Sequence, residues 1–166
     1  MPIQVSVCGP RYCTPEDEQN AFQVGQLLAD HGVTVICGGG VGVMAAVAKG
    51  VRSRGGLVIG IRPGADKSTA SPDLSAVIVT NLGEARNAII VWSADAVIVI
   101  GGSWGTLSEL ALAKRRGDVS VVCLGGWRVV DQDGNQVPGL DEATSPEDAV
   151  NKALAPLGSE DEQSFA

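Results

Sequence analysis

The sequence is poor in aromatic residues, histidine and positive charge. Aromatic residues make up 4% of the chain, there is one histidine, and 12 Lys and Arg stand against 19 Asp and Glu, which gives a net charge of −7. A chain with this balance has no overall positive field to attract DNA or RNA. We therefore expect no nucleic acid polymer as a partner. A small anion is still compatible, because backbone N–H groups and one or two arginines can hold a phosphate locally.

The sequence also lacks paired cysteines, a metal-binding cluster and a long apolar run. Cys8, Cys13, Cys37 and Cys123 form no Cys-x-x-Cys pair, and three of them end apolar runs, so we expect reduced packing residues. No run approaches the roughly 20 apolar residues that span a bilayer. The N-terminus has no basic segment followed by an apolar one. These absences predict a cytoplasmic protein with no membrane contact and no metal site.

Short apolar runs alternate with helix-like stretches along the chain. The runs are continuous rather than alternating, which is typical of strands buried on both faces of a parallel sheet. We predict an α/β fold, a Rossmann-like, doubly wound and mostly parallel sheet flanked by helices, in one domain over residues 1–157 with a disordered tail at 158–166. The expected strands are 3–8, 33–37, 57–61, 76–79, 96–100 and 119–124, and the expected helices are 15–31, 41–54, 82–93, 106–116 and 146–156.

Several helix starts and loops have recognisable local sequences. Thr14 and Ser145 each precede a proline and two acids, which is the chemistry of a capped helix N-terminus. Segments 81–84 and 106–109 have the spacing of capping boxes. The polar loop 62–75 is either a mobile lid or a solvated crossover. Asp133-Gly134 predicts a small hairpin over residues 127–137 at the sheet edge.

Glycine is the abundant residue, with 22 in the chain. Glycine-rich loops follow three predicted strands, at the edge where doubly wound sheets bind ligands. Glycine lets the backbone approach a phosphate closely. The loops match neither a P-loop nor the dinucleotide motif GxGxxG. The predicted ligand-binding residues are Gly9 and Arg11 after the first strand, Gly38, Gly39, Gly40, Gly42 and Met44 after the second, and Gly101, Gly102, Ser103, Trp104, Gly105 and Thr106 after the fifth.

Three side chains near these loops could contribute chemistry. Glu109 either completes a capping box with Thr106 or projects toward a bound ligand, where it could stabilise or deprotonate it. Arg86 either pairs with Glu84 on a solvated helix or clamps a phosphate. Trp104 either packs within the protein, or at a subunit contact, or lies against a flat base or pterin.

Two segments carry a resemblance to a known family. Segments 38–48 and 101–109 resemble the glycine-rich motifs of the LOG-like family of Rossmann-type proteins, formerly labelled lysine decarboxylase-like, and the resemblance covers about residues 3–155. It implies a nucleoside 5′-monophosphate phosphoribohydrolase of the cytokinin riboside phosphate type, with Arg86 and Glu109 as the catalytic pair and no cofactor for catalysis. No pyridoxal-phosphate lysine site supports the older label.

At three places the sequence differs from the pattern of the phosphoribohydrolases and is similar to another branch of the family. Ile100 stands in place of proline, one extra residue separates Gly102 from Gly105, and Asn87 follows Arg86. The branch that these features resemble is that of the molybdenum cofactor carrier protein, which binds a phosphorylated pterin. The ligand is thus a nucleotide monophosphate or the molybdenum cofactor. Binding protein, phosphoribohydrolase and a non-catalytic interaction module all stay open, and we expect a homodimer or higher homo-oligomer through helices 82–93 and 106–116.

Overall fold

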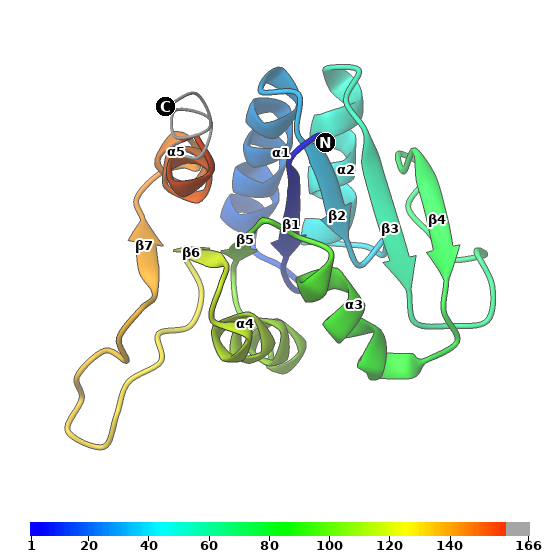
Figure 1. Ribbon diagram of the computed structural model, residues 1–166. Coiled ribbons are helices and arrows are strands. Elements are labelled where there is room, and N and C mark those ends of the chain that lie inside the picture. Colours follow the sequence, from blue (N-terminus) through cyan, green and yellow to red (C-terminus); the bar gives the residue numbers. More distant parts are fainter. Residues whose placement is uncertain (159–166) are drawn as a thin grey trace.

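The computed structural model describes residues 1–158, which form a parallel sheet covered by helices on both faces (Figure 1). Within these residues the sheet has seven strands in the order β4-β3-β2-β1-β5-β6-β7, and every neighbouring pair is parallel. The strands are β1 (Gln4–Cys8), β2 (Thr34–Cys37), β3 (Val58–Arg62), β4 (Ala76–Val79), β5 (Ala96–Ile100), β6 (Ser120–Leu124) and β7 (Asp141–Ala143). The predicted fold class is confirmed.

The helices divide between the two faces of the sheet. Helices α1, α2 and α5 pack on one face, and α3 and α4 pack on the other (Figure 1). Apolar side chains of the central strands are buried under both layers, which explains why the sequences of these strands are mostly apolar, whereas the edge strands β4 and β7 are more exposed. The bounds are α1 (Pro15–Asp30), α2 (Val43–Ser53), α3 (Arg86–Trp92) after the 3-10 turn η1 (Gly83–Ala85), α4 (Trp104–Arg116), and α5 (Pro146–Leu154) before the 3-10 turn η2 (Ala155–Leu157).

Strand β7 is the element that the sequence analysis missed. Its residues Asp141, Glu142 and Ala143 include no apolar run, because β7 is a short edge strand exposed to solvent. The hairpin predicted over 127–137 reduces to one antiparallel bridge between Val130 and Gln136, and the chain after it leads into β7.

Two predicted helix starts are confirmed and two are wrong. The Thr14 and Ser145 hydroxyls accept hydrogen bonds from the Asp17 and Asp148 backbone N–H groups, at 3.1 Å each. No capping bond forms at 81–84 in the described structure, because the chain enters a 3-10 turn there. Helix α4 begins before residue 106, and Ser103 rather than Thr106 caps it.

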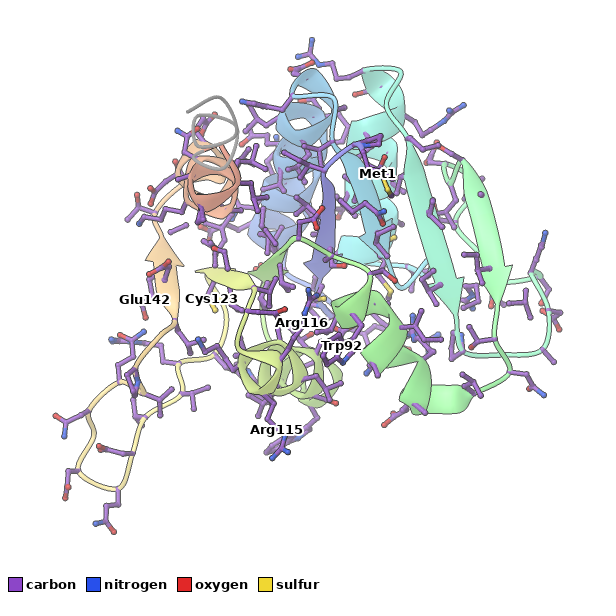
Figure 2. All side chains as sticks on the ribbon, in the orientation of Figure 1. Met1, Trp92, Arg115, Arg116, Cys123 and Glu142 are labelled. Carbon is purple, nitrogen blue, oxygen red and sulfur yellow. The ribbon has the colours of Figure 1, made fainter. Side chains whose placement is uncertain are left out.

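Arg116 joins the C-terminal ends of α3 and α4. Its Nη1 donates to the carbonyl groups of Val91 (2.8 Å) and Ala94 (2.6 Å), and its guanidinium carbon lies 5.0 Å from the centre of the Trp92 ring. Figure 2 shows Trp92 and Arg116 facing one another from the two helices. This arginine therefore serves helix packing.

The structure also bears on the expected absence of membrane contact and on the expected tail. Within residues 1–158, no helix combines the length and the apolar character needed to cross a membrane. Of the tail predicted to be disordered, residues 159–166 lie outside the described structure.

Candidate ligand-binding site

The loops that follow β1, β2, β3 and β5 meet at one edge of the sheet. All strands are parallel, so their carboxyl ends lie together, and the direction of winding reverses between β1 and β5. Such a switch point opens a crevice for ligands. Here it holds a cavity of about 450 Å³, a size that suits a small molecule. The cavity is lined by Gly9, Pro10, Arg11, Tyr12, Gly40, Met44, Arg62, Pro63, Glu84, Arg86, Asn87, Ser103, Gly105, Thr106 and Glu109.

Most of the predicted site residues line this cavity, but several glycines lie beside it. Gly42 precedes α2 with a φ of 68°, and a Cβ on it would come within 2.4 Å of the Arg11 carbonyl oxygen. Gly39 also has a φ of 68°. These glycines allow the conformation of the loops, because a side chain at either position would have a strained φ and would collide with neighbouring backbone atoms. The predicted residues outside the lining are Gly38, Gly39, Gly42, Gly101, Gly102 and Trp104.

Trp104 lies at the start of α4 and outside the cavity lining. Its side chain is 79% exposed and contacts Trp127 edge to face, with ring centres 5.1 Å apart. Trp127 in turn covers Gly102, where a Cβ would meet its Cδ1 at 2.5 Å. The tryptophan in the glycine loop therefore contacts one ring of its own chain and otherwise lies exposed outside the cavity.

Six residues of the lining were missed by the sequence analysis. They follow the ends of β1 and β3 or begin the segment around η1, so their position after a strand end was the signal that could have identified them. They are Pro10, Tyr12, Arg62, Pro63, Glu84 and Asn87.

Arg86, the first residue of α3, reaches across to the loop after β2. Its Nη1 donates to the carbonyl groups of Gly38 (3.0 Å) and Ile61 (2.5 Å). Its Nε has no hydrogen-bond partner among residues 1–158, and it forms no ion pair with Glu84 in that part of the chain. Burial lowers the pKa of Arg86, Glu109 raises it and Arg62 lowers it. The main-chain bonds fix the guanidinium at the cavity wall.

Glu109 is the buried carboxyl group of the cavity. Its side chain is 7% exposed, and burial raises its pKa to about 7, against the opposing effects of Arg86 and a hydrogen bond with the Cys8 thiol. The capping box with Thr106 does not form, because the helix starts earlier. At neutral pH this carboxyl is divided between its protonated and ionised forms.

The charges around the cavity favour an anion in spite of the acidic chain. Arg11, Arg62 and Arg86 line it with Glu84 and Glu109, and Glu109 is only partly ionised near pH 7. Hydroxyl groups of Ser103 and Thr106 add polar groups at the α4 terminus. In the described residues there is no group of three or more His, Cys, Asp or Glu that could hold a metal ion. The arrangement is therefore equipped for a phosphate.

The model of the SLOG cluster4 family matches residues 2–150. The chain belongs to this family. Its structure is similar to that of the molybdenum cofactor binding protein from Rippkaea orientalis, with 36% identity, a TM-score of 0.81 and coverage of 96% of this chain and 98% of that one. It is also similar to the molybdenum cofactor carrier protein of Chlamydomonas reinhardtii, with 28% identity, a TM-score of 0.83 and coverage of 96% and 99%.

One protein with a similar sequence is named as an enzyme. The cytokinin riboside 5′-monophosphate phosphoribohydrolase of Mycobacterium marinum is 32% identical over 128 residues, which are 72% of this chain and 68% of the enzyme. The predicted membership of the LOG-like family, on the branch of the molybdenum cofactor carriers, is thus confirmed.

Proposed function

We propose that this LOG-like protein binds a phosphorylated heterocycle, a nucleotide or the molybdenum cofactor, in the cavity at the switch point of the sheet. The observation that carries the proposal is the environment of Arg86. Its Nη1 is held by two main-chain carbonyl groups, its Nε has no partner among residues 1–158, and it borders a cavity of about 450 Å³. A fixed guanidinium loses little freedom when it binds an oxyanion.

The start of α4 supplies the second part of the binding arrangement. Ser103 and Thr106 line the cavity at the N-terminus of this helix, where the helix dipole and the first-turn backbone N–H groups that Ser103 does not cap favour a phosphate. Gly105 lies between them, and the absence of a side chain there allows close approach of the ligand. The full-length similarity to two molybdenum cofactor binding proteins supports a role in holding the ligand.

Binding is tested by calorimetry with nucleoside monophosphates, and by purifying the protein from cells that make the molybdenum cofactor and measuring the fluorescent oxidised pterin that it releases. We expect one of these ligands to bind, and Arg86→Gln to weaken it at least about tenfold, because a charge-assisted hydrogen bond is lost. Arg54→Gln is the matched control, because Arg54 caps the C-terminal end of α2, whereas the cavity lies at the N-terminal end of that helix. No binding of any nucleotide and no released pterin would refute the proposal.

A second candidate function, phosphoribohydrolase activity, is favoured by the position of Glu109. This carboxyl and Arg86 line the same cavity, and each shifts the pKa of the other. In its ionised form Glu109 could stabilise the oxocarbenium-like ribose that forms when the N-glycosidic bond breaks, or activate the attacking water. The ionised fraction rises with pH through about 7, so activity would rise over the same interval.

The hydrolase candidate is tested by incubating the protein with AMP and measuring free adenine. If it is an enzyme, Glu109→Ala should abolish release, and Glu147→Ala, an exposed carboxylate at the start of α5, should not. Base release that is unchanged in Glu109→Ala would show that this carboxyl has no part in the reaction.

A further inference from the structure

Arg62 is a second arginine of the cavity, and no role follows for it from the sequence. It ends β3, and its side chain lies over the glycine loop after β2. A Cβ on Gly39 would come within 3.1 Å of its Cδ, and a Cβ on Gly40 within 3.1 Å of its Nη1. Its Nη2 donates to the Thr69 hydroxyl. Its Nε is buried and has no hydrogen-bond partner among residues 1–158.

The loop between β3 and β4 holds Arg62 in this place. The backbone N–H of Ser71 donates to the Gly39 carbonyl group at 3.0 Å, and Ser71 is 7% exposed. The segment 62–75 is thus attached to the glycine loop, and it positions Thr69 beside the Arg62 guanidinium. The loop between β3 and β4 therefore orients one of the arginines of the cavity.

Arg62 and Arg86 carry like charges over the same glycine loop, with the buried carboxyl of Glu109 beside Arg86. A Cβ on Gly38 would come within 2.6 Å of the Arg86 Nη1, and a Cβ on Gly40 within 3.1 Å of the Arg62 Nη1, so the two guanidinium groups lie near one another. The charge of Arg62 accordingly lowers the pKa of Arg86. Neither takes part in the ion pairs found within residues 1–158. Two neighbouring cations that are partly removed from water repel each other, and an anion bound at Arg62 in addition to the one at Arg86 relieves this cost.

Arg62 and the start of α4 lie toward different ends of the cavity. Arg62 follows β3, whereas Ser103 and Thr106 follow β5, and β2 and β1 lie between these strands. Three strand spacings separate the ends of β3 and β5 by about 14 Å. The Arg62 side chain turns back over the β2 loop, which still lies two strand spacings, about 10 Å, from the loop after β5, so a ligand that contacts both ends is larger than one phosphate group.

We infer that Arg62 binds a second anionic group of the ligand, apart from the phosphate that Arg86 and the start of α4 hold. The preferred ligand class is then a phosphorylated heterocycle with two separated anionic groups, such as a nucleoside 3′,5′-bisphosphate, rather than a nucleoside monophosphate. This inference rests on the proposed function, because it assumes that the cavity binds a phosphorylated ligand.

The test compares AMP, ADP and adenosine 3′,5′-bisphosphate by calorimetry with the full chain. ADP has added charge on an adjacent phosphate, so it separates the effect of charge from the effect of spacing. The bisphosphate should bind at least about tenfold more tightly than AMP, the gain expected from one charge-assisted contact, and ADP should gain less. Equal affinities for AMP and the bisphosphate overturn the inference and leave the proposed function standing. Absence of binding by all three compounds overturns the inference, and it overturns the proposed function as well only when the purified protein also releases no pterin.

Variants assign the preference to Arg62. Arg62→Gln should weaken the bisphosphate at least about fivefold more than it weakens AMP. Thr69→Val, on the exposed loop, should reduce the preference in part, since it frees the guanidinium without removing it. Arg54→Gln, at the far end of α2, should change neither affinity. Equal losses for AMP and the bisphosphate in Arg62→Gln would show that this arginine binds the single phosphate, which contradicts the inference.

Discussion

The cavity depends on a few side chains whose ionisation and freedom are set by their neighbours. Arg86 gives two hydrogen bonds to main-chain carbonyl groups, so its position is fixed before a ligand arrives. Glu109 is buried beside it, and its carboxyl accepts the hydrogen bond of the Cys8 thiol. Because burial raises the pKa of Glu109 to about 7, the charge of the cavity changes within the physiological pH range.

At the residue scale, we predict that Glu109→Gln gains stability relative to the wild type as the pH rises. The pKa of Glu109 is raised from 4.5 to about 7 in the folded protein, so the folded state holds a proton that the unfolded state has already lost. This contribution is complete below the unfolded pKa and is lost as the pH rises through the folded one. The variant cannot titrate at this position.

The measurement is urea unfolding of both proteins from about pH 4.5 to about pH 8. The free energy of unfolding of the variant, relative to wild type, should rise over this interval by about 3 kcal/mol, the equivalent of the pKa shift. A difference that stays constant with pH would show that Glu109 titrates near its usual value in the folded protein.

At the scale of elements, helices α1 and α2 approach one another through glycine. A Cβ on Gly25 of α1 would lie 2.4 Å from the Val47 carbonyl oxygen, and a Cβ on Gly50 of α2 would lie 2.1 Å from the Phe22 carbonyl oxygen. Both glycines are buried, and the opposing atoms are backbone, which cannot turn aside. The backbones of the two helices are therefore in direct contact, and the helices together cover this part of the sheet.

We predict that Gly25→Ala destabilises the protein even though alanine is the better helix former. The separation forced on α1 and α2 should cost about 1–3 kcal/mol as overpacking, more than offsetting the gain of about 1 kcal/mol in helix propensity. Thermal or urea unfolding measures the change. Gly64→Ala is the control, because a Cβ there meets no atom within 4 Å and its φ is not positive. An unchanged or raised stability in Gly25→Ala would contradict the close contact.

At the scale of the whole molecule, the acidic charge of the chain contrasts with the arginines of the cavity. The chain has a net charge of −7, yet arginines gather at the carboxyl edge of the sheet. An acidic surface discourages polyanions and still admits a small anion that fits between the loops. On the face formed by α3 and α4, Trp92 is 64% exposed, although its ring is covered in part by Arg116.

We predict that the protein is a homodimer or higher homo-oligomer and that the α3–α4 face forms the contact. An exposed tryptophan on a helical face is the kind of apolar anchor that interfaces use. Light scattering after gel filtration should give at least twice the mass of one chain, and Trp92→Asp should reduce it to the monomer. Val130→Asp, an exposed apolar position outside these helices, is the control. A wild-type monomer would refute the prediction, and an unchanged oligomer in Trp92→Asp would place the contact elsewhere.

Much of the fold and part of the site could be predicted because their causes are local. Continuous apolar runs predicted six of the strands of the described sheet, and the residues around Thr14 and Ser145 predicted two helix starts, since a cap needs only neighbours a few positions away. The glycine loops after β1, β2 and β5 indicated the edge of the sheet at which the cavity lies. Strand β7 has no apolar run, so its sequence did not reveal it.

The sequence by itself determined the layers, the family and the location of the loops, whereas the tertiary structure decided which side chains share the cavity. Arg62 faces it because β3 lies two strands from β1 and its loop attaches to Gly39, contacts that join distant parts of the chain. Trp104 lies outside it, exposed at the start of α4 and in edge-to-face contact with Trp127. The raised pKa of Glu109 is likewise a result of burial, which exists only after the layers have packed.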